Sequence, residues 1–379
     1  MIREGNRTRV LLLVKGLGLG GVERLLSRSV HDLDRNTFDY EVCYFTPWKD
    51  DVVEEIADAG VVVHCLDVPR DTSLRALTRL HSLLRFGRYD IVHSHSPYPS
   101  VLARLLGVMR RPRPVMVHTE HSLPRSRNVV TRTLNRATYP LCDLVISISD
   151  DVDQSVHAAR SRPRRSTIIR GGVDVDAIRG EADGDDRTRE RLGIPAGSRV
   201  VGNVAHLRPV KGHSLFLEVA AEVLQVMPDV YFVLVGREKE PGYMNQLKTE
   251  AKALGITDHI VFTGFLPNPY PVLQLFDVFL MTSRHEGFPV ALVEAMALGI
   301  PPVSTNVGGV SEAVADGENG LLAPYGESGI LARHVLTVLG DNGLKGRLSH
   351  RGQERVREEF DLSQMTKKVE AEYLDLLAN

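Results

Sequence analysis

The chain has 379 residues, of which 43% are hydrophobic and 25% are charged, and its formal net charge is −2. This composition is ordinary for a globular protein and excludes a disordered, collagen-like or disulfide-stabilised chain. The length favours two domains over one. The near-neutral charge gives no reason to expect a nucleic-acid partner. The three scattered cysteines, Cys43, Cys65 and Cys142, do not form a zinc or disulfide pattern and favour a reducing cytoplasm.

Short apolar, β-branched runs alternate with amphipathic stretches through the first half of the chain. Helical patterns fall between the runs, for example at residues 22–33, 74–85 and 100–106. Continuous apolar strands that are separated by helices predict a parallel sheet covered on both faces. The predicted strands are residues 10–14, 40–44, 61–65, 91–94, 115–119, 144–147 and 167–169.

The alternation stops at residues 174–198, which are polar and contain no strand-like run, and then restarts. The second set of predicted strands is residues 200–205, 231–235, 260–262, 278–281 and 302–304. We therefore expect an N-terminal domain (1–173), a linker (174–198), a second domain (199–358) and a C-terminal helix (359–379) that packs toward the first domain. Open sheets of this kind bind ligands at the carboxyl ends of their strands, so we expect the two domains to face an interdomain cleft.

A glycine-rich loop follows the first predicted strand. Gly16-x-Gly18-x-x-Gly21 matches the dinucleotide fingerprint. That interpretation needs an acid at the end of the second strand, and Glu41 lies near the start of that strand instead. An NAD-dependent dehydrogenase is thus a minor alternative. Glycines here allow a ligand to approach the backbone closely, although a tight turn without a ligand explains them equally well.

Two glutamates flank the start of a predicted helix after residues 278–281. Glu286 precedes the helix, Pro289 suits its first turn, Glu294 lies inside it and Gly299 ends it. Eight helical residues rise ~12 Å, which is too far for a pair acting on one glycosidic bond, where carboxylates lie ~5–9.5 Å apart. The spacing better suits two contacts along one extended ligand of sugar, diphosphate and ribose. Solvated surface acids are the alternative.

Two cations follow the first strand of the second domain. Arg208 and Lys211 can neutralise a departing diphosphate, or they can simply lie in a solvated loop.

These segments together resemble glycosyltransferase family 4, which comprises retaining, nucleotide-sugar-dependent enzymes of the GT-B fold. The resemblance rests on Glu286-x7-Glu294 with Gly287-Phe288-Pro289, on Arg208 and Lys211-Gly212, and on Gly20-Gly21-Val22-Glu23. Val307-Gly308-Gly309-Val310 and Asp316-Gly317-Glu318-Asn319-Gly320 add to it, in the same order as in the family. One departure is Gly171, where the family usually has asparagine.

The resemblance implies a role for each matching residue. Glu286 would bind donor-sugar hydroxyls, Glu294 the ribose, and Arg208 with Lys211 the diphosphate. His121, after the strand at 115–119, would contact the sugar near its 6-hydroxyl. The expected residues are His121, Glu286, Arg208 and Lys211 for catalysis; Gly20, Gly21, Arg208, Lys211, Glu286, Gly287, Phe288 and Glu294 for the donor; and Glu23, His93 and His95 on the acceptor side.

Histidines raise the question of a metal. His93 and His95 share a strand face, and His118 with His121 forms a second pair. No aspartate or cysteine accompanies them at a ligand-like spacing. We expect no metal and no cofactor, since the nucleotide-sugar is itself a substrate.

Residues 104–170 are strongly basic, with 13 arginines against five acids, a local charge of +8. Arg125, Arg132 and Arg136 would share one helix face beside Val130, Leu134 and Tyr139. Such a surface suits either anionic lipid or plain solvent. We therefore expect a cytoplasmic protein and leave open a peripheral contact with the inner face of the membrane.

The sequence thus predicts a retaining hexosyltransferase. The expected donor is a UDP-sugar, with GDP-mannose second, and the expected acceptor is lipid-linked or a saccharide, in cell-envelope or exopolysaccharide biosynthesis. A sugar-nucleotide epimerase of the same fold is the main alternative.

Overall fold

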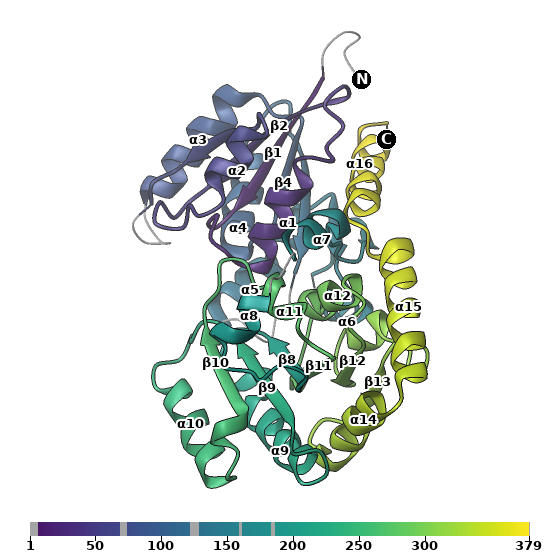
Figure 1. Ribbon diagram of the computed structural model, residues 1–379. Coiled ribbons are helices and arrows are strands. Elements are labelled where there is room, and N and C mark those ends of the chain that lie inside the picture. The colour runs from purple at the N-terminus through teal and green to yellow at the C-terminus, as the bar shows by residue number, and fades with distance from the viewer. Residues whose placement is uncertain (1–6, 69–73, 122–128, 159–160, 183–185, 379) are drawn as a thin grey trace. The chain divides into compact units, whose positions relative to one another are not determined.

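The structure is a computed structural model that describes residues 7–68, 74–121, 129–158, 161–182 and 186–378 (Figure 1). The chain divides into two compact units. Unit 1 comprises Met1–Gly172 together with Leu362–Asn379, and unit 2 comprises Val173–Asp361.

Within the described residues, unit 1 is built on a seven-stranded parallel sheet with the strand order β3-β2-β1-β4-β5-β6-β7. Its strands are β1 (Thr8–Val14), β2 (Phe38–Tyr44), β3 (Val62–Cys65), β4 (Ile91–Ser94), β5 (Val115–Glu120), β6 (Leu144–Ser147) and β7 (Ser166–Ile168). Its helices are α1 (Gly21–Ser29), α2 (Val53–Asp58), α3 (Leu74–Gly87), α4 (Pro97–Gly107), α5 (Val129–Ala137), the 3-10 turn η2 (Tyr139–Leu141), α6 (Asp150–His157) and α16 (Leu362–Ala378).

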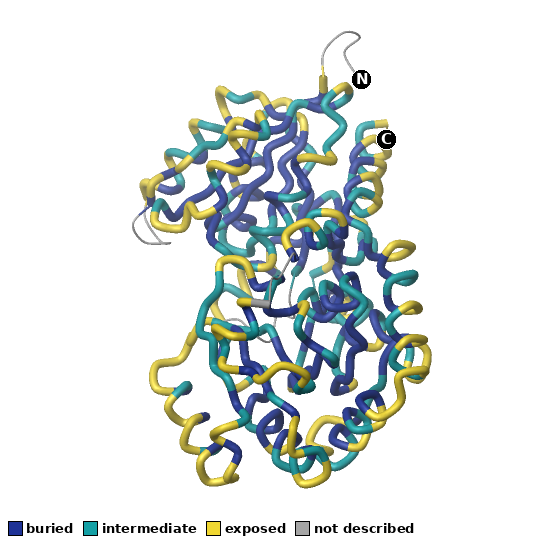
Figure 2. Tube along the Cα trace, in the orientation of Figure 1, coloured by how far each residue is buried: buried dark blue, intermediate teal, exposed yellow. Residues whose placement is uncertain are grey.

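Strand β1 contributes buried side chains to a hydrophobic core on each face of this sheet. Val10, Leu12 and Val14 belong to one buried cluster, and Leu11 and Leu13 belong to another. Alternate side chains of a strand point to opposite faces, so a strand buried on both faces reads as a continuous apolar run. Each fully buried valine or leucine contributes roughly 1.5–3 kcal/mol. Figure 2 shows the strands buried and the helices exposed on their outer sides.

The last helix completes the first of these two cores. Tyr373 is 1% exposed and packs edge-to-face on Phe38, while Met365 and Val369 contact the same cluster. Helix α16 also contacts α1. Its carboxylate Glu370 accepts hydrogen bonds from Tyr40 Oη (2.8 Å) and from the backbone N–H of Asp34 (2.9 Å). Unit 1 is therefore assembled from two separate parts of the chain.

In the described residues, unit 2 holds a six-stranded parallel sheet with the order β10-β9-β8-β11-β12-β13. Its strands are β8 (Arg199–Val204), β9 (Val230–Val235), β10 (Ile260–Gly264), β11 (Val278–Met281), β12 (Pro302–Thr305) and β13 (Leu321–Ala323). Its helices are α7 (Val175–Glu181), α8 (Asp186–Arg191), η3 (Pro209–Lys211), α9 (His213–Leu224), α10 (Tyr243–Ala253), η4 (Thr257–His259), α11 (Tyr270–Leu273), α12 (Val290–Ala297), α13 (Val310–Ala313), α14 (Ser328–Gly340) and α15 (Asn342–Glu359).

The expected pair of doubly wound α/β sheets is confirmed, and two local features differ from the expectation. The segment 174–198 carries helices α7 and α8, which pack on α11 and α12 within unit 2. Strand β13 was not predicted, because three residues between Gly320 and Pro324 are too short to show a pattern. None of the helices in the described ranges is long and apolar enough to cross a membrane.

Candidate functional site

In unit 2 the predicted donor-binding residues gather where the strand order reverses. The chain runs from β8 outward to β10 and then returns to β11 on the other side of β8. Such a switch point leaves a crevice at the carboxyl ends of the two strands, where open α/β sheets bind ligands. Arg208 and Lys211 follow β8, and Glu286 follows β11.

Lys211 and Glu286 form an ion pair across this switch point. Lys211 Nζ lies 2.6 Å from Glu286 Oε1 and 2.8 Å from Oε2. Ser283 Oγ donates a third hydrogen bond to Oε1 at 2.5 Å. Glu286 is only 8% exposed, so the alternative of a solvated surface acid is wrong for this residue. A buried carboxylate needs such partners, because an unpaired buried charge is costly.

Two glycines allow the surrounding loops to come this close. A Cβ on Gly308 would lie 1.9 Å from the carbonyl oxygen of Glu286, and a Cβ on Gly212 would lie 1.9 Å from that of Thr282. Both glycines have positive φ, 53° and 67°, which other residues rarely adopt. The backbone N–H of Gly309 donates to Glu286 O at 3.3 Å. The loop that carries Glu286 is thus set by backbone contacts.

Glu294 lies inside α12, as predicted, and accepts a hydrogen bond from Tyr270 Oη at 2.9 Å. It is half-buried. Phe288, just before α12, is buried and packs on Phe360 with ring centroids 5.4 Å apart, while Gly287 is half-buried. Packing of Phe288 therefore fixes the start of α12.

The loop after β8 is strongly positive. Arg208 is exposed and Lys211 is half-buried. Burial, and next to it the nearby cations Lys239, Arg208, Lys211 and Arg237, together lower the pKa of His206 to about 4. Since these cations already disfavour a protonated imidazole, the same field favours a bound anion such as a diphosphate.

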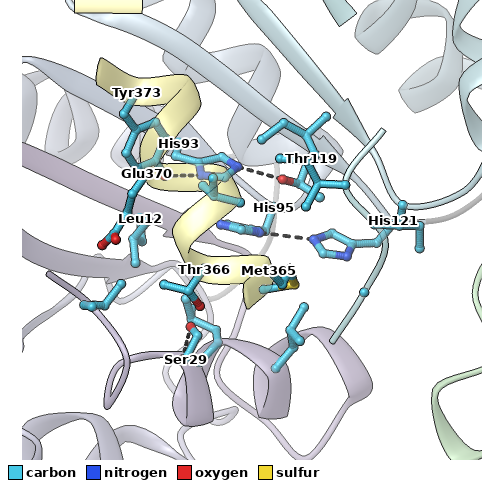
Figure 3. Close-up of a pocket in the computed structure, with 18 of the residues that line it drawn as sticks. Leu12, Ser29, His93, His95, Thr119, His121, Met365, Thr366, Glu370 and Tyr373 are labelled. Carbon is cyan, nitrogen blue, oxygen red and sulfur yellow. Dashed lines mark hydrogen bonds between the residues drawn. The ribbon is translucent and has the colours of Figure 1, made fainter. Parts of the chain in front are cut away.

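In unit 1 the switch point lies between β1 and β4, and the predicted histidines gather at β4 and β5. His95 Nδ1 and His121 Nε2 are 3.1 Å apart (Figure 3). The rings of His93 and His95 stack with centroids 4.2 Å apart. Burial lowers the pKa values of His93 and His95 well below the ordinary 6.5, so both imidazoles are neutral at pH 7.

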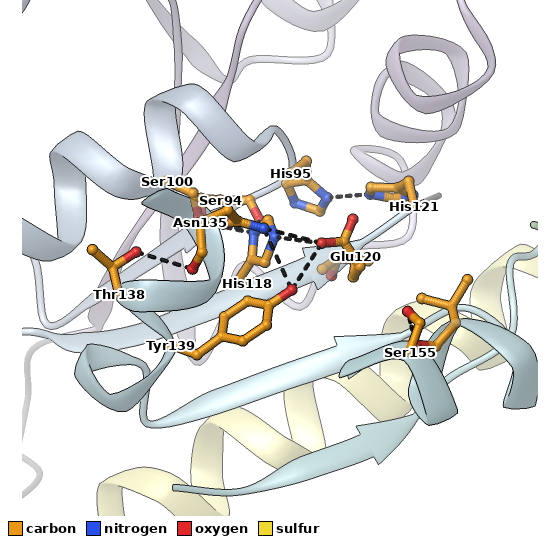
Figure 4. Close-up of polar contacts among 12 residues, drawn as sticks. Ser94, His95, Ser100, His118, Glu120, His121, Asn135, Thr138, Tyr139 and Ser155 are labelled. Carbon is orange, nitrogen blue, oxygen red and sulfur yellow. Dashed lines mark hydrogen bonds and ion pairs between the residues drawn. The ribbon is translucent and has the colours of Figure 1, made fainter. Parts of the chain in front are cut away.

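His118 is directed away from His121, into a separate buried network (Figure 4). Its Nδ1 donates to Ser94 O at 2.9 Å, and its Nε2 lies 3.6 Å from Glu120 Oε2. His118 and His121, although close in the sequence, therefore make separate contacts. Among the described residues, no group of three histidine, cysteine or acidic side chains could hold a metal ion.

The same network contains two charged residues that sequence reasoning missed, Glu120 and Arg104. Glu120 Oε2 accepts from Asn135 Nδ2 (3.2 Å) and Tyr139 Oη (3.1 Å). Arg104 is 1% exposed and donates to Asn135 Oδ1 and Thr138 Oγ1, both at 3.0 Å. Asn135 thus links a buried guanidinium to a buried carboxylate. The residue order along each helix gave no sign of this pairing.

The glycine-rich loop of unit 1 leads into α1 at the carboxyl end of β1. Gly20 is the N-cap of α1, Gly21 is exposed, and Glu23 lies in the first turn. A Cβ on Gly21 would meet nothing within 4 Å, which leaves room for a ligand. Glu41 instead accepts hydrogen bonds from His64 Nε2 and Tyr89 Oη, both at 2.6 Å. This occupied carboxylate argues against the dehydrogenase alternative.

Part of the positive charge of the basic segment 104–170 is buried or paired with acids. Arg104 is buried, Arg113 pairs with Asp143, and Arg165 pairs with Glu372 and Asp375. The expectation that Tyr139 joins the face of α5 is wrong, because Tyr139 is fully buried in η2. The expected Arg125 lies outside the described residues.

Helix α5 nevertheless exposes apolar side chains. Val129, Val130 and Leu134 are 65%, 69% and 50% exposed. The half-buried Arg132 and Arg136 lie two residues before and two residues after Leu134.

Comparison with known proteins finds two matching family profiles and several related enzymes. The profile of the family "Glycosyl transferases group 1" matches residues 184–355, and that of "Glycosyltransferase Family 4" matches residues 19–177. The chain is 25% identical over 377 residues, covering 95% of both chains, to the UDP-Gal:alpha-D-GlcNAc-diphosphoundecaprenol alpha-1,3-galactosyltransferase of Escherichia coli. It is 33% identical over 191 residues to the lipopolysaccharide core biosynthesis glycosyltransferase LpsE of Rhizobium meliloti, covering 50% of this chain and 53% of that protein.

A solved structure has the same fold. The structure of Anabaena Alr3699/HepE in complex with UDP and glucose superposes with a TM-score of 0.85 at 23% identity, covering 97% of this chain and 100% of that one. At this identity the likeness shows the fold, with two Rossmann-like α/β units.

Proposed function

Because the chain belongs to the group 1, family 4 glycosyltransferases, we propose that it transfers a hexosyl unit from a UDP-sugar, with retention, to a lipid-linked or saccharide acceptor. GDP-mannose is the second candidate donor. The observation that carries the donor assignment is the ion pair between the half-buried Lys211 and the buried Glu286 at the switch point of unit 2, with the exposed Arg208 in the same loop as Lys211.

When the proposed donor binds, its diphosphate replaces Glu286 as the partner of Lys211. Lys211 is held by a single carboxylate, and a diphosphate offers it more negative charge. Glu286 would then use its carboxylate oxygens for sugar hydroxyls, while Ser283 still holds Oε1. Glu294, hydrogen-bonded to Tyr270, would receive the ribose hydroxyls, and the backbone at Gly287 and Phe288 would orient sugar and phosphate.

Catalysis then consists mainly of charge stabilisation on the leaving group. As the bond between the anomeric carbon and the phosphate oxygen breaks, negative charge grows on the diphosphate, and Arg208 and Lys211 offset it. The departing phosphate oxygen takes the proton of the acceptor hydroxyl, with attack on the same face of the sugar. No protein nucleophile, metal ion or cofactor is part of this proposal. His121 is assigned to the sugar, and Gly20, Gly21, Glu23, His93 and His95 to the phosphates or the acceptor.

Substitution of the two cations tests this assignment. We expect Arg208→Ala and Lys211→Ala to lower turnover about 10²–10³-fold, with a much smaller effect on the KM for the donor. The measurement is slow donor hydrolysis and transfer over a panel of UDP- and GDP-sugars, and we expect no epimerised nucleotide-sugar.

Arg347→Ala is the matched control. Arg347 is exposed on α15, two residues from Lys345, which pairs with Asp277 just before β11 at the amino end of the sheet. We expect wild-type kinetics for this variant. Wild-type turnover in both Arg208→Ala and Lys211→Ala would contradict the proposed donor site.

The lipid-linked acceptor is supported by a relative and by one helix. The E. coli relative carries diphosphoundecaprenol in its name, and α5 exposes Val129, Val130 and Leu134 next to arginines. An apolar stripe flanked by cations suits the surface of an anionic bilayer. We propose that α5 brings the enzyme to its acceptor there, in cell-envelope or exopolysaccharide assembly.

Vesicle co-sedimentation tests the role of α5. We expect binding to phosphatidylglycerol vesicles that weakens with salt, and a severalfold loss of binding for Val130→Asp and Leu134→Asp. Val226→Asp, which changes a valine 65% exposed in unit 2, is the control and should bind as wild type. If the wild-type protein does not sediment with anionic vesicles at low salt, the membrane proposal is wrong.

A further inference from the structure

A continuous row of side chains links the C-terminal helix to the residue that follows β5. Tyr373 on α16 hydrogen-bonds through its hydroxyl to His93 Nδ1 (Figure 3). The ring of His93 stacks on His95, whose Nδ1 contacts His121 Nε2 at 3.1 Å. We call Tyr373, His93, His95 and His121 the histidine row. It connects α16 to the carboxyl ends of β4 and β5.

The histidine row lies along a small apolar cavity of about 60 Å³. Leu12, Leu26, Ile146, Met365 and Val369 are among its lining residues. Tyr373 and His93 are each 1% exposed, so their polar atoms depend on one another rather than on solvent.

These surroundings select one tautomer for His93. Burial raises the pKa of Tyr373 well above its ordinary value, so the phenol keeps its proton and can donate it to His93 Nδ1. A neutral imidazole carries one N–H, which then resides on Nε2. That N–H points to Thr119 Oγ1 at 2.7 Å.

Similar reasoning assigns the tautomers of His95 and His121. His95 Nε2 is shielded from solvent and has no hydrogen-bond partner among the residues that the structure describes. A buried N–H without an acceptor is rarer than an unused acceptor. His95 therefore carries its N–H on Nδ1 and donates to His121 Nε2. His121 must then carry its own N–H on Nδ1.

From this arrangement we infer that Tyr373 is a positioning residue for His121. Its hydroxyl fixes the ring of His93, the stacked ring of His93 supports His95, and His95 selects the Nδ1–H tautomer and ring orientation of His121. This inference rests on the proposed function only in assigning His121 to the sugar. The C-terminal helix thereby acts on a residue of the proposed site without contacting any substrate.

The test removes the hydroxyl of Tyr373 and compares the result with removal of another tyrosine hydroxyl that makes a hydrogen bond between α16 and the rest of unit 1. Tyr373→Phe deletes the hydrogen bond to His93 but keeps the ring that packs on Phe38. Tyr40→Phe is the matched control, because it deletes a hydrogen bond to Glu370 on α16 and leaves the histidine row intact. The readouts are the imidazole nitrogen signals of ¹⁵N-histidine-labelled protein, assigned with His121→Ala, and the kinetics of both variants.

For Tyr373→Phe we expect mixed tautomers of His93 and His121 and a kcat about tenfold lower, with the donor KM within about twofold. For Tyr40→Phe we expect wild-type nitrogen signals and kcat. Wild-type His121 signals in Tyr373→Phe, or the same changes in Tyr40→Phe, would overturn the inference.

A conservative change at His95 tests the middle of the row. His95→Asn keeps an N–H near the position of Nδ1, whereas His95→Ala removes it. We expect His95→Asn to retain the wild-type His121 signals and His95→Ala to lose them, and an equal loss in both would count against the row. The nitrogen signals report this coupling even if the protein transfers no sugar, so failure of the proposed function and failure of this inference are separate results.

Discussion

Glu286 combines a buried charge with a loop that only glycine neighbours permit. Its side chain is held by Lys211 and Ser283, and its carbonyl oxygen lies where a Cβ on Gly308 would be. A side chain at Gly308 would have to displace the backbone of Glu286 itself. A substitution of Gly308 should therefore disturb the position of the Glu286 carboxylate as much as a substitution of its ion-pair partner Lys211.

We predict that Gly308→Ala impairs donor binding and lowers stability. The positive φ alone costs about 1–2 kcal/mol, and the clash with Glu286 O adds to it. Gly326→Ala is the matched control, since Gly326 also has positive φ (93°) but a Cβ there meets nothing within 4 Å. Denaturant unfolding and UDP titration provide the measurements. Equal losses for both variants would show that the contact with Glu286 does not matter.

At the scale of the element, α16 is attached to unit 1 through a buried acid. Burial raises the pKa of Glu370 above its ordinary value of 4.5, although hydrogen bonds from Asp34 and Tyr40 partly counteract this. The folded protein thus holds this proton more tightly than the unfolded chain does. The stability that Glu370 contributes accordingly falls as the pH rises from about 4.5 through its folded-state pKa.

We predict that Glu370→Gln gains stability relative to the wild type as the pH rises from about 4.5 through the raised folded-state pKa of Glu370, and that the difference is constant at higher pH. The amide oxygen can accept both hydrogen bonds, while the buried negative charge is removed. Glu372→Gln, on the same helix and paired with Arg165, is the control and should change stability by less than about 1 kcal/mol. A stability gap that is constant or shrinks over that rise in pH would argue against this account.

At the scale of the whole molecule, the two units should respond to different changes. Unit 2 carries the proposed donor site, whereas unit 1 includes both the first part of the chain and residues 362–378. A ligand and a truncation should therefore affect different units.

We predict that ending the chain at Asp361 lowers amide protection in β1 and β5 but leaves β8 and β11 protected, because the core that loses Tyr373 belongs to unit 1. UDP should protect the loops after β8 and β11 only. Hydrogen exchange by mass spectrometry measures both effects. Leu374→Ala, which changes a residue 40% exposed on α16, is the control. Loss of protection spread evenly over both units would refute the prediction.

The architecture was readable from the sequence because buried parallel strands leave continuous apolar runs. Strands β4, β6 and β11 begin and end at the predicted residues. The partners of the site residues could not be read in the same way. Lys211 meets Glu286 because β8 lies next to β11, and strand order is a property of the whole sheet.

The histidines show the same limit. Sequence spacing suggested His93 with His95 and His118 with His121, and the first pair does stack. The parallel register sets Ser94 opposite His118, which carries His118 into the buried network and leaves His121 to meet His95. Arg104 escaped notice because an arginine on an amphipathic helix is normally solvated. Its burial is explained by residues far along the chain, Asn135, Thr138 and Tyr139.

The place of α16 in unit 1 also bears on synthesis at the ribosome. The first 172 residues emerge early, yet their core lacks Tyr373 until translation reaches the last helix. Domains usually fold in the order in which they are made, but here unit 2 has its full complement of residues first. Until α16 has been made, the apolar residues of unit 1 that pack on it, such as Phe38, lack this cover.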